Sequence, residues 1–524
     1  MSVVSVTPQQ MAEQNKLIQE LYNIYSLASM NKGCPYTYNI QTFGCQLNES
    51  DSEKLAGVIE AMGLIPTEDD AADLVILNTC SIRENADDRL FGHLGILKTR
   101  KKMNKNMMIA VCGCMMKQPI HVEKIRKSYP HVDMVFGPQD IHRFPEILHA
   151  FQVSKKKSTE ISDTDFLADN VYMPIARART HRALVPIMYG CNNFCTYCVV
   201  PGARGRERSR LPEHIIEEIK SLVKDGYKEI VLLGQNVNSY GNDFEESLDT
   251  NHFAKLLKEV AEIPGLYRLR FMTSHPKDLT REVMDVMASH ANIERHLHLP
   301  VQSGSNDVLR RMNRHYTREH YMDTVRYFRS VLPEATISTD IIVGFPGETK
   351  QDFSETLEVV RAARFDAAFT FHYSKRPGTP AAQMSDQIPK EVVGERFARL
   401  LDVQNTLCYE SNALVEGTEL ELLVEGSSDT SADVYTGRSS ENRLVNFTIP
   451  AGAILPGGTS MVVDSPPNGK SLEGSIAIVR IVKAKPFSCE GVLVHFCENI
   501  KKRSDIVDNR RKQTIADDNS RHGE

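Results

Sequence analysis

Three cysteines with the spacing C-x-x-x-C-x-x-C are the residues of this chain best suited to do chemistry. Cys191, Cys195 and Cys198 stand in the run GCNNFCTYCVVPGARGRERSR. Cysteine thiolates are the usual ligands of iron–sulfur clusters, and a four-iron cluster normally takes four of them. Three ligands leave one iron open, and an open coordination position is where a metal site does chemistry, as it is for zinc. The spacing therefore predicts a reactive four-iron cluster.

A structural zinc site is the alternative interpretation of the same three cysteines. Structural zinc takes four Cys or His ligands, so this interpretation requires a fourth ligand nearby. His181 is the nearest upstream candidate. The motif favours the cluster and leaves the zinc site open as the second possibility.

Further cysteines end apolar segments between residues 36 and about 150. YTYNIQTFGC ends at Cys45, ADLVILNTC ends at Cys80, and MMIAVCGC ends in the Cys112/Cys114 pair. Apolar strands that alternate with helical patterns predict a parallel sheet with helices on both faces. Ligands of such sheets bind at the carboxyl ends of the strands. A buried inert thiol is the simpler explanation for any one of them, but three matching strand ends predict a second cluster site, with Cys112 or Cys114 as its third ligand.

The strand–helix pattern resumes at Ala183 and repeats six times. Six units predict a partial, open barrel better than a closed eight-stranded one. Its expected strands are ALVPIMYG, EIVLLGQN, YRLRFMTS, RHLHLPVQ, ATISTDIIVGF and AAFTFHYS. After about residue 410, short alternating segments split by Gly, Pro and Ser predict a small antiparallel barrel or sandwich. These segments are ELELLVEG, DVYTGRSS, RLVNFTI, SMVVDS and SIAIVRIVKA.

The chain is expected to be an α/β protein of several domains joined by a polar linker at residues 151–175. A helix with Met11, Leu17, Ile18, Leu21, Ile24 and Tyr25 on one face is expected in the amino-terminal extension. The expected bounds are an extension at 1–35, an open parallel α/β domain at 36–154, the partial barrel at 177–407, the small β-barrel at 410–495 and a charged, disordered tail at 498–524.

Composition limits the compartment and the partners. The 524 residues are 41% hydrophobic and 25% charged, and no apolar run is long enough to cross a membrane. The amino terminus lacks the pattern of a secretory signal. Eleven cysteines in such a chain indicate a reducing cytoplasm and metal ligation rather than disulfides.

The net charge of −6 does not indicate nucleic-acid binding, but local clusters of basic residues do. A solvated surface is the simpler explanation for any one cluster, whereas arginines on both sides of a cofactor motif favour phosphate contacts. The clusters are Arg177, Arg179 and Arg182; Arg204, Arg206, Arg208 and Arg210; and Lys98, Arg100, Lys101, Lys102 and Lys105.

Taken together, the motifs resemble the methylthiotransferases of the radical S-adenosylmethionine (SAM) superfamily. The resemblance runs from about Tyr36 to about Cys497 and is closest to the branch that modifies N6-dimethylallyladenosine in tRNA. It rests on QTFGCQLNESDSE, ILNTCSIRENA, VCGCMMKQ, CNNFCTYCVVPGARGRERSR, LLGQNVNSYG, HLPVQSGS, MNRHYTREHY, DIIVGFPGET and YSKRPGTPAA.

The resemblance implies two four-iron clusters and SAM as cofactors. It assigns Cys191, Cys195 and Cys198 to the radical SAM cluster. It assigns Cys45, Cys80 and Cys114 to an auxiliary cluster, because Gly113-Cys114 matches the family's Gly-Cys step. The small β-barrel corresponds to the family's RNA-binding TRAM domain. The implied walls of the SAM pocket are Gln302, Ser303, Gly304, Gly344, Gly347 and Glu348, although ordinary turn chemistry also explains these residues.

The implied reaction replaces the hydrogen on carbon 2 of an adenine next to the anticodon with a methylthio group. In the family, one SAM methylates a sulfur on the auxiliary cluster, and a second SAM is cleaved to a radical that activates the adenine. The expected partners are the tRNA anticodon stem-loop and a reduced flavodoxin-type or ferredoxin-type electron donor. The sulfur donor is not implied. We expect a cytoplasmic monomer that does not bind a membrane.

Alternatives to this activity remain at the level of sequence. One sister branch modifies threonylcarbamoyladenosine in tRNA, and another modifies an aspartate of a ribosomal protein. The runs Asn192-Asn193-Phe194 and NVNSY favour the dimethylallyl branch. A non-catalytic, metal-stabilised RNA-binding module is an alternative of another class. Gly202 departs from the family, in which an aromatic residue is common at this point, and makes the local packing uncertain.

Overall fold

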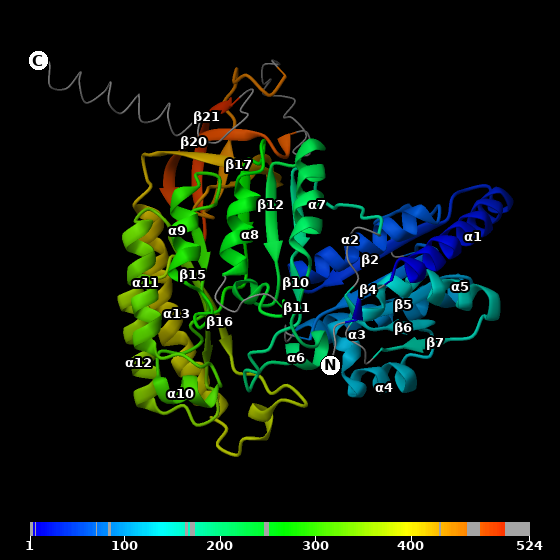
Figure 1. The fold of residues 1–524 in the computed structure, drawn as a ribbon, viewed down its shortest axis with the longest axis horizontal. Helices are drawn as coiled ribbons and strands as arrows, with labels where there is room; N and C mark the ends of the chain where they lie inside the picture. Colours follow the sequence, from blue (N-terminus) through cyan, green and yellow to red (C-terminus); the bar gives the residue numbers. More distant parts are fainter. Residues whose placement is uncertain are drawn as a thin grey trace, which may run out of the picture.

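The computed structural model describes residues 4–5, 7–69, 71–81, 85–162, 166–167, 173–245, 251–428, 431–457 and 472–497. An α/β domain packs beside a partial barrel, and a small β-barrel covers one end of that partial barrel (Figure 1). The expected tail at 498–524 lies outside the described residues. None of the helices in the described ranges is long and apolar enough to cross a membrane.

The α/β domain is built on six parallel strands in the order β3-β2-β4-β5-β6-β7. The central strands β4 and β5 are buried along their whole length, which explains their continuous apolar runs. The strands are β2 (Thr37–Phe43), β3 (Ile65–Pro66), β4 (Leu74–Thr79), β5 (Met108–Gly113), β6 (Met134–Phe136) and β7 (Ser158–Glu160).

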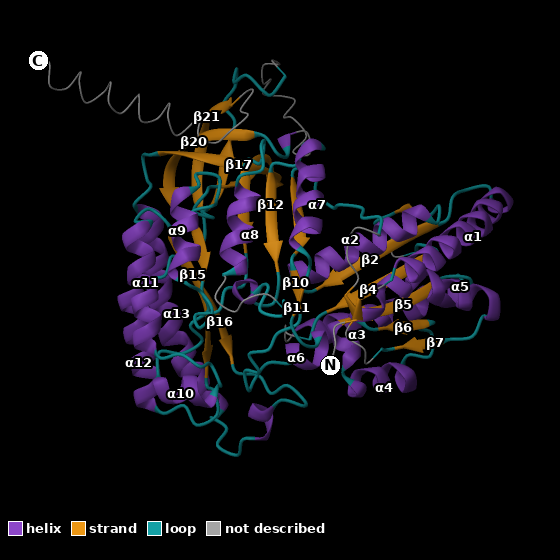
Figure 2. Cartoon of the chain, viewed as in Figure 1, coloured by secondary structure: helices purple, strands orange, loops and turns teal. Residues whose placement is uncertain are grey.

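Helices cover both faces of this sheet, as the sequence predicts (Figure 2). One face packs against α1 (Pro8–Lys32), α2 (Gln46–Ala61) and α5 (Phe144–Ser154). The other packs against α3 (Asn85–Met103) and α4 (Pro119–Ser128). The expected linker at 151–175 is wrong for residues 151–154, which end α5, and for Ser158–Glu160, because β7 extends the sheet.

Helix α1 confirms the expected amino-terminal helix and most of its apolar face. Thr7 and Gln10 form a capping box at its start, and Gly33 ends it in the left-handed conformation, φ 76°. Met11, Ile18, Leu21 and Tyr25 are buried against the sheet domain, and this stripe follows the i, i+3, i+4 rule. Ile24 lies to the side of the stripe and is 39% exposed, so its expected burial is wrong.

The partial barrel has the six expected parallel strands. They form two three-stranded sheets, β9-β12-β13 and β14-β15-β16, which a parallel bridge from Leu269 to Ile293 joins. The strands are β9 (Arg182–Pro186), β12 (Glu229–Leu233), β13 (Arg268–Phe271), β14 (His296–His298), β15 (Thr336–Val343) and β16 (Ala367–His372). The main helices are α7 (Pro212–Lys224), α8 (His252–Ala261), α9 (Arg281–Ser289), α10 (Asn306–Arg311), α11 (Arg318–Val331), α12 (Lys350–Ala363) and α13 (Lys390–Ala413).

The carboxyl-terminal domain is a closed five-stranded barrel in the order β17-β18-β19-β21-β20. Its pairs are antiparallel except for β19 with β21. The strands are β17 (Glu419–Ser428), β18 (Ser431–Arg438), β19 (Leu444–Thr448), β20 (Ile476–Ala484) and β21 (Cys489–Cys497). Strand β21 was not expected, and the expected segment SMVVDS lies outside the described residues.

The small barrel packs at the amino ends of the partial-barrel strands. Arg268, the first residue of β13, is completely buried and pairs with Glu421 of β17 at 3.0 Å. Its guanidinium also donates to the carbonyl of Arg438, and Lys228, just before β12, donates to the carbonyl of Gly474. The arrows of β12 and β15 in Figure 1 point away from this domain.

Helix α2 joins the α/β domain to the partial barrel. Leu47 packs with apolar residues of β9, β10 (Met188–Tyr189) and β12, and Lys54 donates to the hydroxyl of Tyr189 at 2.7 Å. Glu53 pairs with Arg177 at 3.2 Å. Because polar side chains on both sides of this interface have partners, the two domains have a defined mutual orientation.

Candidate iron–sulfur and SAM site

Five of the six candidate cluster cysteines line one cavity of about 280 Å³ between the α/β domain and the partial barrel. Cys45 and Cys114 approach it from the sheet domain, and Cys191, Cys195 and Cys198 approach it from the barrel. Cys80 is fully buried and interacts with the Cys45 thiol. Two groups of three thiols, more than 70 residues apart in sequence, therefore meet at one place.

The carboxyl ends of three neighbouring strands position the thiols of the sheet domain. Cys45 caps α2 just after β2, Cys80 follows β4, and Cys114 begins a short 3-10 helix, Cys114–Lys117, just after β5. This arrangement follows from the alternation of strands and helices, since parallel strands bring their carboxyl ends to one edge.

Gly113 sets the direction of Cys114. Its φ is 101°, and a Cβ at this position would lie 2.2 Å from the carbonyl oxygen of Thr79. Only glycine fits such a backbone. Cys112 lies on β5 and is buried in the core that contacts α1, α2 and α5. The structure thus places Cys114 at the cavity and Cys112 away from it.

The loop Cys191–Cys198 follows the first strands of the barrel and is braced from both sides. Gly190 has φ 78°, and a Cβ there would lie 1.9 Å from the carbonyl oxygen of Arg206. The Asn313 amide donates to the carbonyl of Phe194 at 3.0 Å, and the Cys198 amide donates to the carbonyl of Cys195 at 2.9 Å. These contacts hold the loop in place.

His181 is not placed to complete a zinc site with these cysteines. It precedes the amino end of β9, whereas the cysteine loop follows the opposite end. Its Nδ1 lies 3.9 Å from the carboxylate of Glu473, in the segment before β20. The fourth ligand that the zinc interpretation required is therefore at the wrong end of the strand.

Burial makes thiolates costly at this site in the absence of metal. It raises the pKa of Cys191 to about 11 and that of Cys198 to about 12. The contact with Cys80, together with burial, raises the pKa of Cys45 well above its usual value. A buried thiol ionises readily only next to a positive charge or a metal. The thiols therefore fit a group that supplies positive charge of its own.

The remaining cavity wall has polar atoms without partners. The hydroxyl of Ser274 and Nε2 of His275 are buried and make no hydrogen bond. Such atoms are costly unless a ligand or water satisfies them. A donor set of three thiols on each side and an unsatisfied polar wall fit two clusters and a polar cofactor.

Within the described residues, no three Cys, His, Asp or Glu side chains converge on the position of a single metal ion. A four-iron cluster does not require such a convergence, because each cysteine binds its own iron.

Of the six expected SAM-pocket residues, one lines the cavity and the others pack elsewhere. Gln302, with φ 66°, lines the cavity. Ser303 and Gly304 pack on α12, where the Gly304 amide donates to the Thr356 hydroxyl at 3.0 Å.

The other three SAM-pocket candidates form a turn. Gly344 and Gly347 have φ near 78°. The Glu348 carboxylate pairs with Arg396 at 2.6 Å and accepts from the Gly344 amide. Gln302 is thus the one member of the set that lines the cavity, and a SAM role for the six remains a prediction.

Sequence reasoning missed several residues of the cavity. Arg314 donates to the Cys195 sulfur at 3.4 Å, and Asp340 lies 3.7 Å from Nε2 of His298. Nδ1 of His275 accepts from the Lys277 amide at 3.2 Å, so its Nε2 carries the proton. The alternation in RHLHLP and STDII was a signal for inward-facing His298 and Asp340. No spacing pattern pointed to Arg314.

The four arginines after the cysteine loop are mostly buried. Arg204, the last residue of α6, and Arg208 are buried, and Arg210 pairs with Glu218 at 2.9 Å. Arg206 is exposed, and its guanidinium lies over the ring of Phe194 at 4.3 Å. Gly202 is exposed on α6 (Val200–Arg204), with open space where its Cβ would project, so the departure from the family does not disturb packing.

Buried histidines, among them His181 and His296, make stability depend on pH. Burial lowers the pKa of His181 to about 4 and that of His296 well below 6.5. The unfolded state therefore binds more protons below pH 6.5, and stability falls as the pH falls. Lowering the pH from 7.5 to 5.5 should cost about 1.4 kcal/mol per histidine. Urea unfolding at the two pH values measures this loss of unfolding free energy. The loss should be smaller by this amount in His296→Asn, but unchanged in a variant of the exposed His495. An equal effect in all three proteins would contradict the assignment.

The architecture and the cysteine loop are those of a radical SAM protein, and comparisons with known proteins agree. The model of the "Radical SAM superfamily" matches residues 185–360, and that of the "Uncharacterized protein family UPF0004" matches residues 37–137. A radical SAM methyltransferase from Kitasatospora setae, TsrM, shares the fold with a TM-score of 0.50, 14% identity and coverage of 66% of this chain and 75% of its own.

Curated relatives match nearly the whole chain. A tRNA-2-methylthio-N(6)-dimethylallyladenosine synthase of Acetivibrio thermocellus is 46% identical, with 94% of this chain and 98% of the relative covered. One of Clostridium botulinum, strain Alaska E43, is 49% identical, with 87% and 95% covered. The chain therefore belongs to the tRNA-2-methylthio-N6-dimethylallyladenosine synthase family of radical SAM enzymes. Membership implies SAM and four-iron clusters as cofactors.

Proposed function

We propose that this enzyme adds a methylthio group to carbon 2 of N6-dimethylallyladenosine next to the anticodon of tRNA. The observation that carries the proposal is the meeting of two three-cysteine groups at one cavity. The family of the chain supplies the substrate. The threonylcarbamoyladenosine and ribosomal-protein activities are not favoured, because the curated relatives carry the dimethylallyladenosine name.

Cys191, Cys195 and Cys198 are proposed to hold the radical SAM cluster, and Cys45, Cys80 and Cys114 the auxiliary cluster. When bound, these cofactors supply a carbon radical and a sulfur. The radical is needed because acid–base groups alone cannot remove the hydrogen of an adenine C–H bond. Cysteines of both groups line one cavity, and clusters held by them would reach the same adenine without its moving between sites.

Residues of the cavity wall are proposed to bind and orient ligands. Burial and then Arg314 hold the pKa of His275 at about 2, so its imidazole stays neutral and offers Nε2–H as a hydrogen-bond donor. Arg314 also contributes a fixed positive charge beside Cys195. The buried position of these groups strengthens their electrostatic effect and limits access of water.

The electron donor, the compartment and the oligomeric state belong to the same proposal. A reduced donor of the flavodoxin or ferredoxin type provides the electron, and the enzyme works as a cytoplasmic monomer. None of the eleven cysteines is in a disulfide, which is typical of a reducing compartment.

Iron and sulfide quantitation, coupled to nucleoside analysis of tRNA, tests the function. Anaerobically purified protein should contain roughly eight irons, as two four-iron clusters require. Total tRNA from a deletion strain should lack the methylthio nucleoside and retain N6-dimethylallyladenosine, and the wild-type gene should restore the product. Zinc in place of iron would favour the non-catalytic module, and loss of a threonylcarbamoyl derivative instead would favour the sister branch.

Arg206 is expected to contact an RNA phosphate. It is the exposed arginine of the four that follow the cysteine loop. Each phosphate contact releases counterions, so Arg206→Ala should reduce the slope of log affinity against log salt by roughly one unit. Binding of tRNA across a salt series measures this slope. Arg361→Ala, which removes an exposed arginine of α12, is the matched control. Equal slopes in the two variants would contradict an RNA contact at Arg206.

A further inference from the structure

Arg204 connects the two groups of cysteines. It is the last residue of α6, which begins two residues after Cys198. Its side chain crosses into the α/β domain, where Nε donates to the sulfur of Cys114 at 3.0 Å. Arg204 is only 5% exposed. A cation from the helix that follows one cysteine group thus contacts a cysteine of the other.

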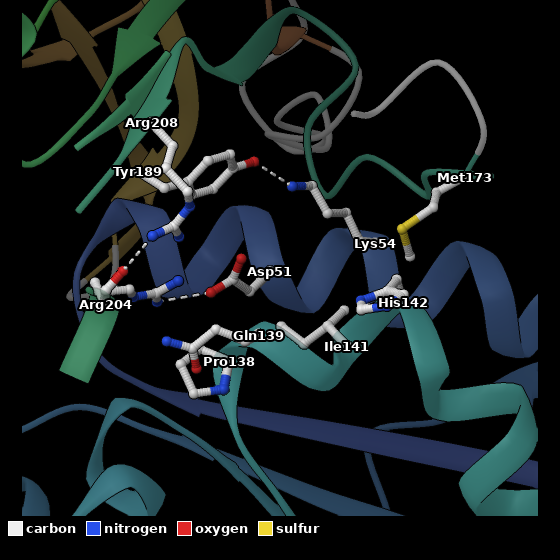
Figure 3. A pocket seen from close by; sticks show the side chains of 10 residues that line it. All are labelled: Asp51, Lys54, Pro138, Gln139, Ile141, His142, Met173, Tyr189, Arg204 and Arg208. Atoms are coloured by element: carbon white, nitrogen blue, oxygen red, sulfur yellow. Dashed lines mark hydrogen bonds and ion pairs between the residues drawn. The ribbon is translucent and has the colours of Figure 1, made fainter. Parts of the chain in front are cut away.

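The second partner of Arg204 is Asp51 of α2. Nη2 of Arg204 lies 2.7 Å from the Asp51 carboxylate, which is 3% exposed (Figure 3). Arg208 donates to the Arg204 carbonyl at 3.1 Å, and Gln139 donates to the neighbouring Ala203 carbonyl at 3.2 Å. These bonds fix the backbone of α6, so the guanidinium has a defined position.

The charges at this contact are complementary. The buried guanidinium of Arg204 lies between the Asp51 carboxylate at 2.7 Å and the Cys114 sulfur at 3.0 Å. A structural ion pair would be complete with Asp51 alone. The additional N–H donated to the Cys114 sulfur indicates that Arg204 also acts on the cluster proposed to be bound by that sulfur.

We propose that Arg204 is a positioning residue that raises the reduction potential of the auxiliary cluster and fixes its place relative to the radical SAM loop. The inference rests on the proposed function. Hydrogen bonds to ligand sulfurs and the local charge set the potential of iron–sulfur clusters. An N–H donor that carries a positive charge acts through both effects and favours the reduced cluster.

The potential is measurable in a variant that retains only the auxiliary site. Replacing Cys191, Cys195 and Cys198 together by alanine leaves the other three cysteines to bind iron. Iron and sulfide analysis counts the cluster, and a redox titration followed by electron paramagnetic resonance gives its midpoint potential. In this background Arg204→Gln should shift the midpoint to a lower potential. Arg361→Gln, which removes an exposed arginine of α12, should leave it unchanged.

Asp51→Asn provides a test that does not remove the sulfur contact. It removes the negative partner of Arg204, so the midpoint should shift upward, opposite to the effect of Arg204→Gln. An unchanged midpoint in iron-replete Arg204→Gln would overturn the proposal. If Arg204→Gln does not retain iron, the midpoint potential of Asp51→Asn becomes the test. An unchanged midpoint in Asp51→Asn would then overturn the proposal. Failure of the parent triple variant to bind iron would instead contradict the auxiliary site itself, and with it the role of Arg204.

Discussion

Replacement of Cys191, Cys195 or Cys198 by alanine is expected to abolish both SAM cleavage and methylthio transfer. The loop supplies three thiolates, and the nearest upstream alternative ligand, His181, lies at the opposite end of β9. The loss of one thiolate leaves two ligands, which should release the cluster. Production of 5′-deoxyadenosine with dithionite as reductant measures the cleavage, and nucleoside analysis of tRNA measures the product.

An exposed cysteine gives the matched control. Cys34 lies just after α1, away from the cavity, and Cys34→Ala should keep the iron content and both activities of the parent. Steady formation of 5′-deoxyadenosine by any of the three loop variants would contradict their assignment as ligands.

Replacement of Cys45, Cys80 or Cys114 by alanine should separate the two activities. These thiols follow strands of the other domain, so the radical SAM loop and its braces stay intact. The variants should bind about half of the parent's iron, because one of two four-iron clusters is lost. They should continue to cleave SAM but form no methylthio product.

Cys112 is the matched control for this second set. It is buried two residues before Cys114 but faces the core of the sheet. Cys112→Ala should cost some stability, because it removes buried volume, and should retain both clusters and the product. A Cys112→Ala variant that loses iron, together with a Cys114→Ala variant that keeps it, would reverse the choice of ligand.

Much of the fold was predictable because its signals are local. Apolar runs of strand length alternate with helical patterns, and this alternation gave the parallel sheet, the six barrel strands and the small β-barrel. Strands β3 and β7 lie at the sheet edges and are short and partly or fully exposed, so no apolar run marks them. The rule of strand carboxyl ends brought Cys45, Cys80 and Cys114 together, but it could not place them at the same cavity as Cys191.

Burial of charge was the main property that sequence could not predict. Arg204, Arg208 and Arg210 have the pattern of an RNA-binding patch, yet each is buried with polar partners. A charge is normally excluded from the interior unless a partner from a distant segment reaches it. Asp51, which pairs with Arg204, lies more than 150 residues earlier in the chain. Such partners become evident only when the domains are placed together.

The position of the small barrel has a consequence for how a tRNA is chosen. It sits at the amino ends of the barrel strands, tied by the buried Arg268, whereas the cysteine cavity lies beyond the carboxyl ends. The eight residues of β15 alone separate the two ends by about 26 Å. If the small barrel binds RNA, a substrate that touches both must be rigid and long enough to cover this distance. The protein would then select tRNA by its shape and length. A short oligonucleotide with the correct base should therefore be a poor substrate.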